Sequence, residues 1–507
     1  MAHITTCPRI LSLSAEPWHV GRFCMYKYAV ALKLEVGRRA LLCQIALLTS
    51  FLSAGRASVV YYPPAQSKIN NLTFALNGTG APGIFTSSST PDESYGEYNW
   101  CNMPHVRTRE YQTPPSEFTL EYVEVIQRHH KRTPYGSNTF FKEDITWSCT
   151  GEGPVQYGKG PNGVSSDVTE IQWQAYRDSQ NPWTNSVGPG FVNSNCQLPQ
   201  ITGDGLVDAH THGSDLRAVY ASRLGLGDRL DPSIVQIRVT NNGITSQVAG
   251  ALLKGLFPKT DNVAVLVQSS TFDSLEPVYS CPKADSIRSA YTSGSTNWTT
   301  HLTDAALLYA KLDSVSGIAT ADTAGWHTSF DHYYDNLSAK LCHGKKLPCS
   351  VNDTSLCVTQ DEANTVFRLG NWEYSYYFRD APNSAQYAAL HYGAWFLELR
   401  PHLAAAVAGK NKIKYTHNIA HDGSVSPVLG FLQIANMVWP GMGSEVVFEL
   451  YKAKKQNSHF LRVLWGGRPM VTSTSMGTLD MIPVETMLEY IDSMIGSGSD
   501  LYSACHS

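Results

Sequence analysis

One short stretch of the sequence combines positive charge with a side chain that can act as a nucleophile. Residues 128–134 read Arg-His-His-Lys-Arg-Thr-Pro, so that Arg128 and Arg132 bracket His129. The planar guanidinium group of arginine binds phosphate oxygens in bidentate fashion, and histidine can form a covalent intermediate that splits a hydrolysis into two easier steps. The stretch therefore predicts a phosphate site with His129 as the attacking group. The alternative is a solvated basic loop without a chemical role.

A second stretch supplies the acid that such a reaction needs. His421 and Asp422 follow the strand expected over residues 412–419 and precede the helix expected over 426–434. Cleavage of a phosphoester requires a carboxylic acid that protonates the leaving oxygen. Taken alone, Asp422 is more commonly explained as a helix cap. Together with the first stretch, it is predicted to be the proton donor.

The elements around these two stretches must bring them together. Residues 122–126 are rich in aromatic and β-branched side chains and predict a strand that leads into the first stretch, which Pro134 ends. Ligands of open α/β sheets bind at the carboxyl ends of the strands. We therefore expect both stretches at the same edge of one sheet.

Alternating strand and helix patterns predict an α/β fold with a mixed, mostly parallel sheet flanked by helices. Apolar residues at three- and four-residue spacing predict a helix over 200–226, and another is expected over 245–257, before Pro258. Two strands are expected over 233–240 and 263–268. Later elements are expected as helices over 385–399, 426–434 and 483–495 and strands over 412–419, 445–451 and 460–464.

Composition divides the rest of the chain. Residues 270–400 are mainly helical in pattern and are expected to form an inserted domain, within an α/β core made of residues 116–269 and 401–507. Residues 58–115, rich in Pro, Ser, Asn and Gly, predict an extended arm on the surface. The similar composition of residues 151–195 predicts a long loop, functional or tethered by a disulfide.

Residues 1–57 have the composition of a secretory signal. An arginine pair precedes the uncharged stretch 40–55, and cleavage is expected after Ala57. The stretch is shorter than the roughly 20 apolar residues that span a bilayer. The alternatives are retention as a signal anchor, or a later start at Met25.

Cysteines and sequons agree with secretion. Eight cysteines follow residue 57, and an even number in an exported chain predicts up to four disulfide bonds, whose pairing stays open. Five Asn-x-Ser/Thr sequons begin at Asn71, Asn77, Asn297, Asn336 and Asn352. We therefore expect a glycoprotein of the secretory route, destined for the cell exterior, the cell wall or a vacuole.

The overall composition narrows the function classes. The chain has 507 residues, 42% apolar and 16% charged, with a net charge of -4, as in ordinary globular proteins. The near-neutral charge and the absence of a long basic run argue against nucleic-acid binding. No cysteine pair has the close spacing of a zinc knuckle, so no metal is expected.

Taken together, these stretches resemble the histidine acid phosphatases, branch 2 of the histidine phosphatase superfamily, which includes fungal acid phosphatases and phytases. The family signature Arg-His-Gly-x-Arg-x-Pro fits residues 128–134 except at the glycine, which is His130 here. The family's His-Asp element fits residues 421–422, and residues 200–205 are similar to its Gln-Leu-Thr-x-x-Gly helix start. The resemblance spans roughly residues 120–500.

The resemblance implies a role for each matched residue. The chain would hydrolyse small phosphate monoesters at acid pH without a cofactor, through a phosphohistidine on His129 and with Asp422 as proton donor. The side chains implied to bind the phosphate are Arg128, Arg132, His421, Arg217 and Arg238.

Two positions depart from the family pattern. His130 is bulkier than glycine, so the loop must adopt a conformation that a side chain tolerates. Ile244 stands where the family has a third phosphate arginine, and Arg238 is expected to replace part of that charge. These departures keep two alternatives open. One is a phytase-type inositol phosphate phosphatase, and the other is a catalytically weak relative that binds a phosphorylated ligand.

Overall fold

The computed structural model of the chain describes residues 59–84, 100–153, 155–156, 171–178, 180–322 and 324–507. The expected signal segment at residues 1–57 lies outside these ranges. Within them, every helix is too short or too polar to cross a membrane.

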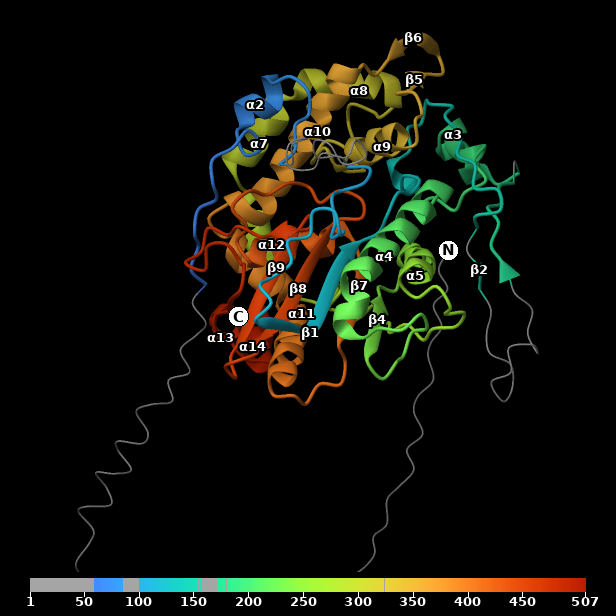
Figure 1. Ribbon diagram of the computed structural model, residues 1–507. Helices are drawn as coiled ribbons and strands as arrows, with labels where there is room; N and C mark the ends of the chain where they lie inside the picture. Colours follow the sequence, from blue (N-terminus) through green and yellow to red (C-terminus); the bar gives the residue numbers. More distant parts are fainter. Residues whose placement is uncertain (1–58, 85–99, 154, 157–170, 179, 323) are drawn as a thin grey trace, which may run out of the picture. The chain divides into compact units, whose positions relative to one another are not determined.

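A seven-stranded mixed sheet carries the rest of the fold, with the order β10-β9-β8-β1-β7-β4 and β11 paired to β9 (Figure 1). The parallel part consists of β1 (Phe118–Arg128), β7 (Tyr415–Ala420) and β4 (Val235–Val239). The antiparallel part adds β8 (Glu445–Ala453), β9 (His459–Trp465), β10 (Arg468–Pro469) and β11 (Ile482–Pro483). The predicted mixed sheet with flanking helices is confirmed, and the expected pairing of residues 445–451 with 460–464 is the β8–β9 ladder.

Helices cover both faces of this sheet because its strands alternate apolar residues toward each side. Val123 and Val125 of β1 pack with α4 (Gly203–Leu224) and α5 (Gly243–Leu256) in one core cluster. Tyr122 and Ile126 face a larger cluster on the other side. The helices that build this second cluster include α6 (Pro282–Tyr291), α11 (Ser384–Val407), α12 (Asp422–Phe431), α13 (Val484–Ile495) and α14 (Gly498–Cys505).

The packing of α4 against α5 depends on a glycine. A Cβ atom on Gly213 would lie 2.0 Å from the carbonyl oxygen of Leu252, so a side chain there would force the two helices apart. Thr202 begins α4 by accepting a hydrogen bond from the amide of Gly205, and Gly225 ends it in a left-handed conformation. These signals explain why the predicted helix over 200–226 forms with nearly the expected bounds.

Along the sequence, the remaining helices fall between α6 and α11 or in the first part of the chain. Figure 1 labels each of them. They are α2 (Leu72–Asn77), α3 (Pro189–Val192), α7 (Thr296–Asp304), α8 (Ala306–Ser316), α9 (Asp331–Cys342) and α10 (Gln360–Ser375), with the single turns η1 (Gly136–Asn138), η4 (Pro182–Ser186) and η5 (Tyr376–Asp380). Two small hairpins pair β2 (Val155–Gln156) with β3 (Ile171–Gln172) and β5 (Cys349–Ser350) with β6 (Asp353–Cys357). The α11 helix runs through residue 400, where the insertion was expected to end. The division into core and insertion stays a prediction.

Two expected elements differ from the structure. The strand predicted over residues 263–268 is reduced to one bridge between Leu266 and Arg238. Val263 and Val265 pack against the core cluster of α4 and α5, but Leu266 and Val267 are about half exposed. The helix expected from residue 426 begins at Asp422 instead, with its first amide hydrogen bonds accepted by the carbonyl of His421. Pro427, which reads as a helix start, lies inside α12.

The expected surface arm is partly buried. Met103, His105 and Val106 are each less than 5% exposed. The amide of Met103 donates to the carbonyl of Met442, and the amide of Val106 donates to Glu445 Oε1 over 2.7 Å. The end of this segment is therefore part of the core that lies next to β8.

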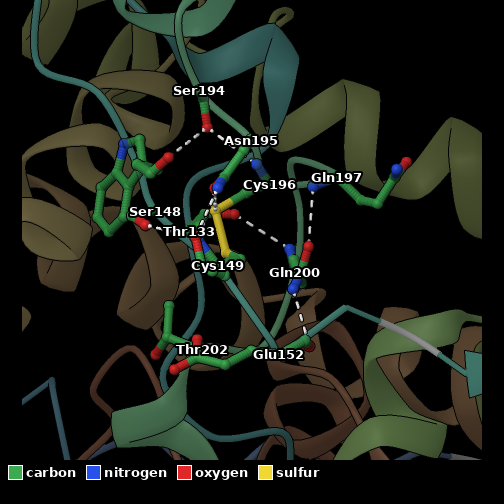
Figure 2. The surroundings of a disulfide bond; sticks show 12 residues. Thr133, Ser148, Cys149, Glu152, Ser194, Asn195, Cys196, Gln197, Gln200 and Thr202 are labelled. Carbon is green, nitrogen blue, oxygen red and sulfur yellow. Dashed lines mark hydrogen bonds between the residues drawn. A yellow bond between two sulfur atoms is a disulfide. The ribbon is translucent and has the colours of Figure 1, made fainter. Parts of the chain in front are cut away.

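Disulfide bonds pair all eight cysteines that follow residue 57. The pairs are Cys101–Cys342, Cys149–Cys196, Cys281–Cys505 and Cys349–Cys357. Figure 2 shows that the bond between Cys149 and Cys196 closes the long loop and lies near Gln200. Gln200 exchanges hydrogen bonds with Thr133, since each backbone amide donates to an oxygen of the other residue over 3.0 Å. The tethered loop thus adjoins the motif at residues 128–134.

Four of the five sequon asparagines are exposed, but Asn336 is fully buried. The Asn336 amide donates to the carbonyl of Asn138 over 2.8 Å and its oxygen accepts from Lys340 Nζ over 2.7 Å. Lys340 in turn pairs with Glu143 over 2.9 Å, and both charges are buried. The folded protein therefore has no accessible acceptor at Asn336.

This buried pair gives a test of how α9 is held. Replacing Lys340 by Met removes the cation and leaves the Glu143 carboxylate buried without its charge partner, so Lys340→Met should lower the free energy of unfolding by about 3–5 kcal/mol. Chemical denaturation measures the change. The double variant Glu143→Leu/Lys340→Met should lose less than Lys340→Met alone. Equal stability of Lys340→Met and the parent would contradict the buried pair.

Candidate active site

The parallel pairing of β1 with β7 places the two sequence motifs side by side. Arg128 lies opposite Ala420 in the ladder, and the amide of His129 donates to the carbonyl of Ala420 over 2.9 Å. The rings of His129 and His421 consequently lie with their centroids 5.5 Å apart. Both strands end at this edge of the sheet, as the sequence predicted.

His129 is neutral and has one ring nitrogen available. Its Nδ1 lies 3.0 Å from the carbonyl oxygen of His130, which can only accept a hydrogen bond, so Nδ1 carries the proton. Burial lowers the pKa of His129 well below its ordinary value, and the positive charges of Arg132 and Arg128 lower it further. The unprotonated Nε2 is therefore the atom that can attack an electrophile, even in acid.

Arg128 and Arg132 are each bound to a carboxylate. Arg128 Nη2 lies 3.1 Å from Asp422 Oδ2, and its Nη1 donates to the carbonyl of Pro440. Arg132 Nη1 lies 2.9 Å from Asp335 Oδ1, and its guanidinium group stacks on the ring of Tyr135. Within the described residues, the buried Nε of each arginine lacks a hydrogen-bond acceptor. Each arginine thus keeps one donor for a further anion.

Asp422 lies in the first turn of α12 and is held by several donors. Its Oδ2 accepts from Trp439 Nε1 over 2.6 Å and from the Tyr374 hydroxyl over 3.3 Å, and its Oδ1 accepts from the amide of Gly423 over 2.9 Å. Burial raises the pKa of Asp422, but Arg128, the Trp439 N–H and Arg132 outweigh that effect and hold the pKa below its ordinary value. The carboxylate is therefore ionised in the ligand-free protein.

A cavity of about 180 Å³ opens onto Arg128, Arg132 and Asp422, whereas His129 lies behind its lining residues. Its two cations are Arg128 and Arg132, its three carboxylates are Asp331, Asp335 and Asp422, and the other lining side chains are Trp100, Tyr135, Asn138, Tyr334, Ser338, Tyr374, Trp439 and Met442. Carboxylates therefore outnumber cations along the wall. Helices α9 and α10 contribute directly, because Asp331 and Asp335 lie on α9 and Tyr374 lies on α10.

His421 is buried beside the same arginines. Its Nε2 lies 2.9 Å from Thr240 Oγ1 and 3.7 Å from Glu276 Oε2. Burial lowers the pKa of His421 to about 4; Asp422 opposes this shift, while Arg132 and Arg128 add to it. A neutral His421 can therefore contact an anion as a hydrogen-bond donor through whichever ring nitrogen carries its proton.

Two predicted phosphate-binding arginines lie outside this cluster. Arg217 donates to the carbonyl of Leu256 over 2.9 Å and pairs with Asp228 over 2.5 Å. Arg238 is neutralised by Glu398 at 2.5 Å and Asp273 at 2.9 Å. Arg238 lies one residue before the end of the parallel ladder, opposite Asn418, whereas Thr240 reaches His421.

The missing third arginine is therefore not replaced by Arg238. Ile244, which stands at that position of the family pattern, is 2% exposed and packs in the core cluster beneath α4 and α5. The cluster thus offers two arginines, Arg128 and Arg132, where the family pattern leads one to expect three.

His130 is accommodated by a buried chain of polar side chains. Its Nε2 lies 3.2 Å from His212 Nδ1, and His212 Nε2 lies 2.9 Å from Glu445 Oε2. His105 stacks on His212 with ring centroids 3.9 Å apart. A Cβ atom at Gly443 would lie 2.9 Å from His130 Nε2, so the loop before β8 needs glycine there. The bulkier residue is thus compensated by polar partners and by a glycine elsewhere.

The sequence did not point to several groups that surround the predicted residues. Asp335, Asp331 and Tyr374 come from helices whose apolar spacing carries no sign of a site. Trp439 precedes a Pro-Gly-Met-Gly run, and this turn signature was the one available hint of a tight loop at the site.

The chain is similar to several known proteins. A family model described as histidine phosphatase superfamily (branch 2) matches residues 119–465. Counting factor 60 of Dictyostelium discoideum is 25% identical over 386 residues, 73% of this chain and 85% of that protein. 2-phosphoxylose phosphatase 1 of Homo sapiens is 22% identical over 499 residues, 92% of this chain and 98% of that protein. The crystal structure of a phytase from Klebsiella sp ASR1 aligns at 16% identity with a TM-score of 0.45, covering 77% of this chain and 97% of the phytase.

The buried histidines make stability depend on pH. Burial lowers the pKa of His130 and of His417 to about 3, below the ordinary value of 6.5, so the unfolded chain binds more protons as the pH falls below 6.5. The contribution of these two histidines to stability should therefore be full above pH 6.5 and fall toward pH 3, by on the order of 1 kcal/mol per pH unit for each histidine. Thermal unfolding at a series of pH values measures the slope. His417→Gln, which cannot titrate, should flatten it, and an unchanged slope would contradict the assignment.

Proposed function

Because the chain belongs to branch 2 of the histidine phosphatase superfamily, we propose that it hydrolyses phosphate monoesters at acid pH through a phosphohistidine on His129. One observation carries the proposal. A neutral, buried His129 lies between two arginines that each keep an unused donor, and Asp422 lies 3.1 Å from one of them.

The first step uses charge to hold the phosphate. A dianionic phosphate group takes the unused Nε donors of Arg128 and Arg132 and competes with Asp422 and Asp335 for the remaining guanidinium nitrogens. His129 Nε2 attacks phosphorus, the bond to the ester oxygen breaks, and its electron pair stays on that oxygen. Asp422 donates a proton to it, and the alcohol leaves.

Substrate binding itself prepares the acid. In the ligand-free protein Arg128 keeps Asp422 ionised, but a bound phosphate shares that cation and adds negative charge beside the carboxylate. Both effects raise the pKa of Asp422, so that it is protonated in the acid range. After the first step the Asp422 carboxylate takes a proton from the water that attacks the phosphohistidine, which returns His129 and the acid to their starting states.

Acid pH suits both groups. Because burial and the neighbouring arginines lower the pKa of His129, the imidazole stays neutral at a pH where ordinary histidines are charged. The same pH favours protonated Asp422. Since the nucleophile stays unprotonated and the acid becomes protonated at low pH, activity should be highest below neutral pH.

The wall of the cavity favours substrates with one phosphate and an uncharged remainder. Near neutral pH three carboxylates face two arginines, so a second phosphate group on the substrate would meet like charge. At acid pH this repulsion comes mainly from Asp335, because burial and the neighbouring carboxylates raise the pKa of Asp331 to about 7. This disfavours the inositol phosphates that a phytase hydrolyses. A phosphorylated sugar fits better, because Asp331 and Asn138 offer acceptors to its hydroxyl groups, and 2-phosphoxylose phosphatase 1 of Homo sapiens is similar over 92% of this chain.

We also propose that the enzyme acts in the secretory route. The four disulfide bonds and the four exposed sequon asparagines are consistent with export and glycosylation. The arm and the tethered loop around the motif are then held by covalent bonds as well as by packing.

The nucleophile is tested with a chromogenic ester. The protein should release p-nitrophenol from p-nitrophenyl phosphate at pH 5 in the presence of a chelator, and His129→Ala should lower kcat by about a thousandfold or more. His210→Ala, which alters an exposed histidine on α4, is the matched control. Retention of parental kcat by His129→Ala, or full loss of activity with chelator, would contradict the mechanism.

Substrate class is tested by comparing the kcat/KM values of two esters. A sugar monophosphate should be turned over with a kcat/KM at least about tenfold above that of inositol hexakisphosphate, since only the latter brings further phosphates toward Asp331 and Asp335. Asp331→Asn should narrow the difference by favouring the polyphosphate above pH 7, where Asp331 is ionised, and much less in acid, where its raised pKa keeps it protonated. A clear preference of the parent protein for inositol hexakisphosphate would support the phytase alternative instead.

A further inference from the structure

We infer that Trp439 is a positioning residue that makes Oδ1 the proton-delivering oxygen of Asp422. The inference rests on the proposed function, since it concerns how the general acid is held. It deepens that function by naming the oxygen that delivers the proton and the side chain that orients it.

The two oxygens of Asp422 have different partners. Oδ2 accepts hydrogen bonds from Trp439 Nε1 over 2.6 Å and from the Tyr374 hydroxyl over 3.3 Å, and it lies 3.1 Å from the Arg128 guanidinium. An indole N–H can only donate, and a guanidinium group is always charged. An oxygen that accepts two hydrogen bonds beside a fixed cation is the less favourable place for a proton.

Oδ1 is differently placed. In the part of the chain that the structure describes, it accepts a single hydrogen bond, from the amide of Gly423 over 2.9 Å. One lone pair is therefore left on Oδ1, and the carboxyl proton resides there. When phosphate draws Arg128 away, the bond from Trp439 continues to hold Oδ2, so the same oxygen keeps the proton through the reaction.

Trp439 is rigid enough to set this orientation. The residue is 2% exposed, and its amide donates to Asn371 Oδ1 over 3.0 Å. Its ring stacks on Tyr334 and on Tyr374, each with centroids 3.9 Å apart. The indole N–H is thus fixed by α9 and α10, and the carboxyl group has to align with it.

Removing this donor has a defined sign. The indole N–H stabilises ionised Asp422, so its loss raises the pKa of the acid. The charged and titratable groups around Asp422, which stay in place, are Arg128, Arg132, His421, Tyr135, Tyr374 and Asp331. A change in pH profile after substitution of Trp439 therefore reports on the lost N–H.

The experiment compares the parent protein with Trp439→Phe on two esters, p-nitrophenyl phosphate and glycerol 2-phosphate. The basic limb of the pH profile of kcat should move up by about one pH unit, the size expected for one lost hydrogen bond to a charged group. The ratio of kcat for glycerol 2-phosphate to that for p-nitrophenyl phosphate should fall about tenfold, because an alkoxide needs a well-aimed proton more than a nitrophenolate does. Tyr374→Phe removes the longer contact and should move both readouts less.

The outcomes separate the possibilities. An upward shift together with the lower ratio supports the inference. An equal loss on both esters with an unmoved profile, or no change in either, overturns it while leaving the proposed function intact. A parent protein that turns over neither ester overturns both. If Trp439→Phe does not fold, benzothienylalanine at position 439 replaces the indole N–H by sulfur in the same shape, and the same two readouts decide.

Discussion

The arrangement of the site depends on two buried guanidinium groups at one edge of the sheet. Arg128 and Arg132 lose most of their hydration there, and a charge taken out of water requires a partner of opposite sign. Asp422 and Asp335 supply those partners at 3.1 and 2.9 Å. A phosphate dianion is a stronger partner for both, so the ligand-free protein holds its arginines with carboxylates that a substrate can displace. One of these carboxylates is the group that must then become an acid.

The partners come from segments far apart in the chain. Arg128 ends β1, Asp422 begins α12 after the neighbouring β7, Asp335 lies on α9, and Trp439 lies in the loop before β8. The sheet brings the first two together through backbone pairing, whereas α9 and α10 must be docked for Asp335 and for the stacking of Trp439. The buried pair of Lys340 with Glu143 and the disulfide between Cys101 and Cys342 both hold α9 in this position. The stability of α9 and α10 and the arrangement of the side chains in the site are therefore linked.

The sequence predicted that the two motifs meet at one edge of the sheet, for a physical reason. Carboxyl ends of neighbouring parallel strands share an edge, so residues 128–134 and 421–422 had to lie close once their strands paired. Arg217 and Arg238 lie outside the cluster. The position of an arginine in a family pattern does not show whether nearby carboxylates neutralise it. Asp228 binds Arg217, and Glu398 with Asp273 binds Arg238. The sequence did not indicate Asp335 and Trp439, because their roles depend on tertiary packing. The fold class followed from periodicity, whereas the strand expected over 263–268 is reduced to a single bridge although Val263 and Val265 pack against the core.

The central claim is that His129 forms a covalent bond to phosphorus. Mixing the protein with excess p-nitrophenyl phosphate, stopping the reaction within the first turnovers in alkaline denaturant and mapping the peptides by mass spectrometry tests it most directly. Alkaline conditions are required because the phosphorus–nitrogen bond of phosphohistidine breaks in acid. The account predicts one added phosphoryl group on the peptide that contains residues 128–134, located on His129. Continued turnover with phosphate on another residue, or with no phosphorylated peptide at all, would contradict it.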